Sequence, residues 1–145
     1  MKLEKGKKNK IKEIASWGPY LRKEWEKHFA NHLSDQEKKR IYLSSDRDTS
    51  GDLWHLFSYK KKKCLEGEKA ETAFNSERKS KCYIFYQDSD YALLLENAEG
   101  FSNSDLMVGA GNDVYVVDKE FRWTFVITHE TYWCGPYFSR KGMAN

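Results

Sequence analysis

The sequence predicts an α+β domain in which N-terminal helices pack on an antiparallel sheet of about five strands. Two observations favour this class. Apolar residues recur every three to four positions early in the chain and every second position in its second half. The segments of the second kind are joined by short turns, and strands joined in this way must be antiparallel because a parallel pair needs a long crossover.

Length and charge limit the organisation of the chain. It has 145 residues, of which 39% are hydrophobic and 32% are charged, which fits one domain with its own core. Residues 1–13 hold six lysines and two glutamates, so the rest of the chain is close to neutral. We therefore expect a flexible basic arm over 1–13 and a single α+β domain over 14–145.

Hydropathy and cysteine content indicate the compartment. The sequence has no run of about 18 apolar residues, and no apolar segment follows the lysine-rich N-terminus, so we expect neither a membrane span nor an export signal. Three cysteines without C-x-x-C spacing fit reduced thiols, which favours the cytoplasm. Cys82 alternates with aromatic residues, and we expect it to be buried.

Two helices are expected first. Pro19 suits a first helical position, and apolar residues then recur every four positions, at Leu21, Trp25, Phe29 and Leu33. Ser34 and Glu37 have the spacing of a capping box, which predicts a second, shorter helix through about Tyr42.

The middle of the chain predicts a loop, a strand and a helix. Residues 44–52 are polar and predict a connector. Leu53–Tyr59 is rich in β-forming residues and predicts a buried strand. Residues 66–78 predict a surface helix, because Ala70 and Phe74 form one narrow apolar stripe among charged residues.

Two hairpins are expected in the second half. Cys82–Tyr86 and Tyr91–Leu95 flank a polar turn, and Val114–Val117 and Phe121–Thr128 flank another. Gly109–Asn112 predicts a turn between the hairpins. In the last strand aromatic residues alternate with others, and we expect the stripe from Phe121 to Ile127 to face inward and act as scaffold.

The candidate metal and cofactor motifs are incomplete. His28 and His32 have the i, i+4 spacing of two ligands on one helix face, but no third ligand follows. Asp46–Gly51 imitates the start of a calcium loop, yet the position of the bidentate acid is Phe57. Gly109-Ala-Gly111 lacks the third glycine of a dinucleotide loop. We expect no metal and no cofactor.

Catalysis by a histidine is the main enzymatic alternative. His129 and Glu130 follow the aromatic strand, and a histidine there can act as a general base with Glu130 or His55 in support. Adjacent strand residues point to opposite faces, so this pairing requires the strand to end between them. A histidine and an acid that anchor a turn are the structural alternative.

A second alternative is nucleic-acid binding. Lys60–Lys63 and the N-terminal arm are basic, and such binding would be steeply salt-sensitive. Short runs of charge are more commonly solvated, and the near-neutral body offers few cations to a phosphate backbone. Nucleic acid is therefore not the expected partner.

Aromatic residues suggest a contact surface. The rings of Tyr132, Trp133, Tyr137 and Phe138 lie beyond the predicted sheet, where they either clamp the tail or form an interface. The residues that we consider for binding are Trp54, His55, Trp123, His129, Glu130, Trp133 and Tyr137.

Several segments resemble a family of small bacterial proteins that is classed as a domain of unknown function. They are Leu53–Ser58, Cys64–Ala70, Asp113–Asp118, Trp123–Glu130 and Gly135–Phe138, and the resemblance covers most of residues 17–138. The final hairpin, with its tryptophan and its Thr128-His-Glu130 ending, is also similar to hairpins of some bacterial immunity proteins that neutralise toxins. The resemblances imply no activity by themselves.

The leading hypothesis is a non-enzymatic protein-binding domain, of the toxin-immunity type, with a protein partner. The first alternative is a small hydrolase or transferase that uses His129 with Glu130 or His55. The second is a weak nucleic-acid binder that uses Lys60–Lys63 and the arm. The oligomeric state stays open.

Overall fold

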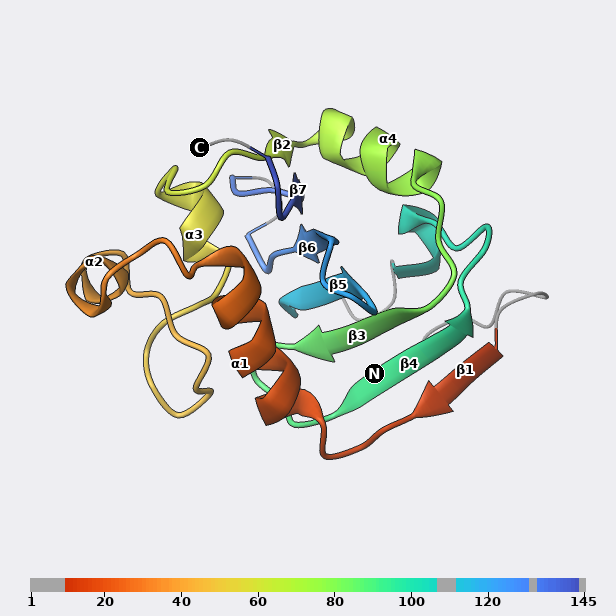
Figure 1. The fold of residues 1–145 in the computed structure, drawn as a ribbon, viewed down its shortest axis with the longest axis horizontal. Coiled ribbons are helices and arrows are strands. Elements are labelled where there is room, and N and C mark those ends of the chain that lie inside the picture. The colour runs from red at the N-terminus through yellow and green to blue at the C-terminus, as the bar shows by residue number, and fades with distance from the viewer. Residues whose placement is uncertain (1–9, 107–111, 131–132, 144–145) are drawn as a thin grey trace.

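A computed structural model describes residues 10–106, 112–130 and 133–143, and their strands form one antiparallel sheet in the order β1-β4-β3-β5-β6-β7-β2 (Figure 1). The strands are β1 (Lys10–Glu13), β2 (Leu65–Glu66), β3 (Cys82–Tyr86), β4 (Ala92–Asn97), β5 (Val114–Asp118), β6 (Trp123–Ile127) and β7 (Tyr137–Arg140). The helices are α1 (Gly18–Phe29), α2 (Asp35–Arg40), α3 (His55–Ser58), α4 (Glu68–Ser76) and the 3-10 helix η1 (Asn103–Leu106). The α+β class and the antiparallel sheet are confirmed.

The described residues contain seven strands where about five were expected. Both predicted hairpins are present, as β3–β4 and β5–β6. The additional strands are β1, β2 and β7. The first two are the outer strands, and each pairs with one neighbour through short registers. Such strands carry little local signal because they depend on a partner far away in the sequence.

Helices cover both faces of the sheet. The expected N-terminal helix α1 lies on one face, and α4, from the middle of the chain, lies on the other. On the first face Trp25 of α1 packs against Tyr115 with ring centroids 5.6 Å apart, and its Nε1–H donates to Thr124 Oγ1 at 2.9 Å. On the second face Phe74 of α4 stacks on Phe125 at 4.2 Å. One apolar cluster therefore lies on each face of the sheet.

The aromatic stripe of the last predicted hairpin faces inward, as expected. Trp123 and Phe125 of β6 are buried in the cluster beneath α4, while Phe121 is buried in the cluster beneath α1. Thr124 and Val126 of the opposite face are buried too. Strand β6 is therefore an interior scaffold strand on both faces.

The helical predictions are confirmed apart from their bounds. Helix α1 has Pro19 in its first turn, and helix α4 buries Ala70 and Phe74. The capping box of α2 is formed, because Glu37 N donates to Ser34 Oγ at 3.1 Å and Ser34 N donates to Glu37 Oε1 at 3.0 Å. It satisfies two backbone donors that the helix itself leaves free.

The predicted strand Leu53–Tyr59 is wrong, because this segment contains the short helix α3. Its apolar residues Leu53, Leu56 and Phe57 fit helical spacing as well as a buried strand, and periodicity cannot separate the two in so short a run. Hydrogen bonds to the side chains of Gln87 and Tyr115 fix the backbone just before α3. Leu53 N donates to Gln87 Oε1 at 2.9 Å and Trp54 N donates to the Tyr115 hydroxyl at 3.2 Å.

The expected flexible arm over 1–13 needs correction at its end, because Lys10–Glu13 is strand β1. Ile11 lies opposite Leu95 of β4 and packs against the second apolar cluster, which holds the strand in place. Residues 1–9 lie outside the described residues, as do Tyr132 and most of the predicted turn 109–112. Within the described part of the chain, no helix combines the length and apolar character that crossing a membrane requires.

Candidate functional site

A cluster of acids and histidines lies at one end of the sheet; we call Asp52, His55, Asp113, His129 and Glu130 the acid–histidine cluster. Asp113 directly precedes β5, and His129 and Glu130 follow β6. Since Val114 pairs with Ile127 in the β5–β6 hairpin, the residues just outside this pair meet at the same edge. Asp52 and His55 come from the start of α3.

The best-defined pair of the cluster is Asp113 and His129. Asp113 Oδ1 accepts from the backbone N–H of His129 at 2.7 Å and from its ring Nδ1 at 2.8 Å. The Asp113 side chain is 2% exposed and the His129 side chain is 42% exposed. This hydrogen bond raises the pKa of His129. A buried carboxylate thus fixes the orientation of an accessible imidazole.

Glu130 approaches the other ring nitrogen of His129, with Nε2 and Glu130 Oε2 3.5 Å apart. Strict strand geometry would separate neighbouring side chains, but β6 ends at Ile127. The condition that the sequence set for a His129–Glu130 pair is therefore met. The ring lies between two carboxylates, one buried and one exposed.

Asp52 links the two histidines of the cluster. Its Oδ2 lies 3.6 Å from His55 Nε2, and its carboxyl group lies near enough to Asp113 and His129 for their charges to act on it. Burial, followed by the nearby charge of Asp113, raises the pKa of Asp52 to about 6. The Asp52 carboxyl group is therefore protonated more readily than an ordinary aspartate, with half-protonation near pH 6.

A row of rings runs beside the cluster. The centroids of Tyr59 and His55 are 5.5 Å apart, those of His55 and Trp54 4.6 Å, and those of Trp54 and His129 5.8 Å. Trp54 is buried, and its Nε1–H has no hydrogen-bond partner in the described part of the chain. His55 is held in place because its Nδ1 donates to the carbonyl of Tyr42 at 2.9 Å.

An exposed tryptophan, Trp133, follows the cluster in the sequence and contacts it through its backbone. Trp133 N donates to the Glu130 carbonyl at 2.8 Å, and the Trp133 side chain is 85% exposed. Tyr42 and Tyr59 are also exposed. We define the aromatic–acid face by the residues that these contacts connect, which are Tyr42, Asp52, His55, Tyr59, His129, Glu130 and Trp133.

Five of the seven residues considered from the sequence are brought together here, namely Trp54, His55, His129, Glu130 and Trp133. The remaining two, Trp123 and Tyr137, are buried in the apolar core, on β6 and β7. Their burial follows from strand β7, which continues the sheet where the sequence suggested a tail.

Two acids of the cluster, Asp52 and Asp113, were missed. The hairpin register was a usable signal for Asp113, because it sets this residue beside the end of the partner strand. Asp52 gave no comparable signal, since it lies in a polar loop. A hydrogen bond from Asp52 N to the carbonyl of Tyr42, at 3.1 Å, holds this part of the loop in place.

The other sequence candidates have structural partners. The His28 ring stacks on Phe121 at 4.7 Å, and His32 Nε2 contacts the Lys61 carbonyl at 2.7 Å, so the two histidines do not converge. In the described residues, no group of three or more His, Cys, Asp or Glu side chains could hold a metal ion. Lys62 of the Lys60–Lys63 run is buried and donates to the Met143 carbonyl at 3.3 Å.

The thiols are poor nucleophiles. Burial raises the pKa of Cys64 to about 11 and that of Cys82 to about 12, so both remain thiols near neutral pH. Cys82 is buried, as predicted, and the three cysteines are unpaired.

The comparison with known families agrees with the resemblance read from the sequence. The family model of DUF4275, a domain of unknown function, matches residues 1–138. The chain belongs to the DUF4275 family. No curated protein and no solved structure matches this DUF4275 chain significantly. Its function must therefore be argued from its own residues.

Proposed function

We propose that this DUF4275 protein is a non-enzymatic protein-binding domain and that the aromatic–acid face is its binding surface. The observation that carries the proposal is Trp133, whose large side chain is 85% exposed and whose backbone N–H donates to the carbonyl of Glu130, a member of the acid–histidine cluster. A tryptophan in water gains free energy when a partner covers it, and tryptophan and tyrosine are enriched among the residues that dominate binding energy.

The aromatic–acid face also carries acidic side chains. Its acids are Asp52 and Glu130, each within 3.6 Å of a histidine ring nitrogen. An exposed aromatic centre with carboxylates at its edge suits a partner surface that presents an apolar pocket flanked by lysine or arginine. The raised pKa of His129 favours its charged form on acidification, which would weaken attraction to such a partner.

The experiment is copurification with the product of a neighbouring gene. We expect a stoichiometric complex with wild type and a loss of affinity of about 30-fold in Trp133→Ala. Trp17→Ala is the matched control, because Trp17 is also an exposed tryptophan but packs against Tyr20 and Tyr83. Equal binding by both variants would refute the assignment of this face.

A toxin is the first partner to test, because the final hairpin resembles those of immunity proteins. In that case, co-expression should protect cells from the toxin and Trp133→Ala should not. The free thiols fit a reducing compartment, so we propose the cytoplasm as the place of binding.

The Asp113–His129 pair favours a second candidate function, general acid–base catalysis in a small hydrolase or transferase. A carboxylate on Nδ1 leaves Nε2 to exchange a proton with water or substrate. Hydrolysis of p-nitrophenyl acetate and p-nitrophenyl phosphate tests this candidate. If the protein is such an enzyme, we expect the hydrolysis rate to fall about 100-fold in His129→Gln and to be unchanged in His32→Gln. Equal rates in both variants would remove this candidate.

A further inference from the structure

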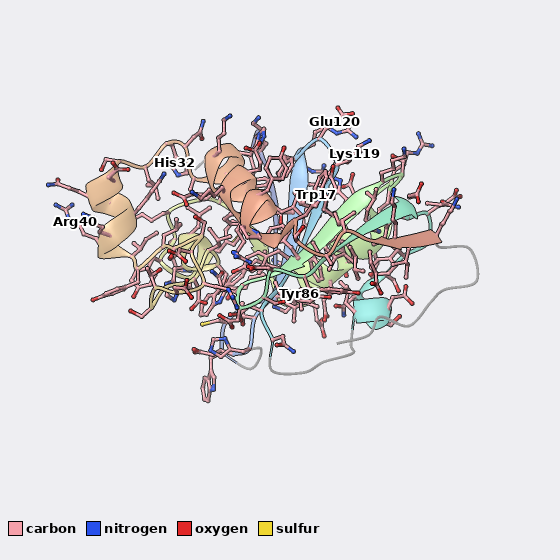
Figure 2. All side chains as sticks on the ribbon, turned by 90° about the horizontal axis from the view of Figure 1, so that it is seen from below. Trp17, His32, Arg40, Tyr86, Lys119 and Glu120 are labelled. Atoms are coloured by element: carbon pink, nitrogen blue, oxygen red, sulfur yellow. The ribbon has the colours of Figure 1, made fainter. Side chains whose placement is uncertain are left out.

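A cavity of about 420 Å³ opens at the end of the sheet where β1, the turn between β3 and β4, and the start of β5 meet. Its lining residues are Glu13, Tyr86, Asp88, Ser89, Tyr91, Asn112 and Asp113. Tyr86 belongs to the apolar cluster on the face of the sheet opposite α1 (Figure 2). The volume falls within the range of small-ligand sites.

The lining is acidic. Glu13, Asp88 and Asp113 are acidic, and among the described residues of the lining none is a lysine, arginine or histidine. The Asp113 side chain is 2% exposed, so Glu13 and Asp88 supply the accessible carboxylates. Two basic groups lie near the lining: His129, whose Nδ1 is 2.8 Å from Asp113 Oδ1, and Arg22, which donates to the carbonyls of Tyr86 at 3.1 Å and Ser89 at 2.5 Å. The Arg22 guanidinium is turned to the backbone of the turn between β3 and β4. Its charge is already paired with Asp90 at 3.0 Å. The cavity therefore favours a positively charged occupant.

Two tyrosines form the aromatic wall. The rings of Tyr86 and Tyr91 are stacked, with centroids 6.3 Å apart. Tyr86 is 5% exposed, and its hydroxyl has no hydrogen-bond partner in the described part of the chain. Buried hydroxyls are normally satisfied, so this group is an independent sign that a polar ligand belongs at the cavity. Aromatic faces also attract cations directly.

We propose that this cavity binds an organic cation, a protonated amine or a guanidinium group, between the carboxylates and the two tyrosine rings. A metal ion is a poorer occupant, because three or more closely grouped ligand side chains are not found in the described residues. The cation is either a free small molecule or a lysine or arginine side chain of a partner. This proposal does not depend on the aromatic–acid face.

Asp113 connects the cavity with His129. Asp113 is one of the lining residues, and its carboxylate accepts from His129 Nδ1 at 2.8 Å. A cation placed beside Asp113 repels the protonated imidazole, so ligand binding should lower the pKa of His129 from its raised position. The imidazole resonances of His129 therefore report occupancy of the cavity.

The experiment compares charged ligands with neutral analogues of the same shape. Titration calorimetry and histidine NMR are carried out with n-butylguanidinium and with n-butylurea. They are repeated with the peptide acetyl-Gly-Arg-Gly-amide and with its citrulline analogue. We expect the charged member of at least one pair to bind and to shift the His129 resonances. Tighter binding of the free cation would identify a small-molecule site, and tighter binding of the peptide would identify a partner side chain.

Two matched variants locate the binding. Asp88→Asn removes a carboxylate of the cavity and should weaken binding about tenfold or more, whereas Asp48→Asn makes the same change on an exposed loop outside the cavity and should leave affinity unchanged. Tyr86→Phe should weaken binding by removing the unpartnered hydroxyl. Absence of binding by both charged probes, equal binding of neutral analogues, or equal loss in the two aspartate variants would overturn the proposal.

Discussion

Replacing Asp52 by asparagine should stabilise the protein at alkaline pH. The folded environment raises the pKa of Asp52 from its ordinary 3.8 to about 6, which corresponds to about 3 kcal/mol. The Asp52 side chain is 22% exposed, and solvent screening reduces the effect of its charge. We therefore expect about 1.5 kcal/mol, half of the full value. Asparagine has nearly the same shape as aspartate and carries no charge at any pH.

The direction in which the free energy of unfolding changes with pH follows from the linkage between protonation and folding. Because the folded pKa is raised, the stability that the Asp52 proton supplies is fully present below pH 3.8 and is lost as pH rises through about 6. Urea unfolding at pH 4 and pH 8 measures this change. Wild type and Asp52→Asn should differ little at pH 4, and the variant should be more stable at pH 8. Asp48→Asn serves as the exposed control. An Asp52→Asn variant that is equally or less stable at pH 8 would refute the reasoning.

Three substitutions test the scaffold by thermal and urea unfolding. Ser34→Ala removes the α2 cap and should cost about 1 kcal/mol, a loss that Ser50→Ala in the polar loop should not reproduce. Phe74→Ala removes the ring stacked on Phe125 and should cost about 4 kcal/mol; a cost below about 1 kcal/mol would contradict this packing. Arg22→Met leaves the carbonyls of Tyr86 and Ser89 without their charged donor and should cost at least about 2 kcal/mol, whereas a neutral result would show that the turn between β3 and β4 does not need Arg22.

Local pattern was sufficient for some elements of the fold. The capped helix α2 and the hairpin β5–β6 follow from residues close together in the sequence. Helix α3 was mistaken for a strand because the N–H groups just before it, of Leu53 and Trp54, are satisfied by side chains more than thirty positions away in the sequence. Strands β1 and β7 were missed because their burial comes from pairing with distant neighbours.

The candidate site was predicted in part for the same reason. His129, Glu130 and Trp133 lie on one stretch of chain, so their proximity was readable. Asp52 reaches Asp113 only through tertiary folding, and the raised pKa of Asp52 depends on that burial and that neighbour. Residue types at a site can thus be proposed from sequence, whereas the raised pKa of Asp52 depends on burial and on a neighbour that only the folded chain supplies.

The two outer strands have a consequence for self-association. At one border of the sheet stands β1, with the sequence Lys-Ile-Lys-Glu, and at the other stands β2, which is only two residues long. Charged or very short borders discourage a second chain from adding its own strand. Copies of this protein should therefore resist fibre-like stacking, and a dimer would have to form through side chains rather than through a shared backbone ladder.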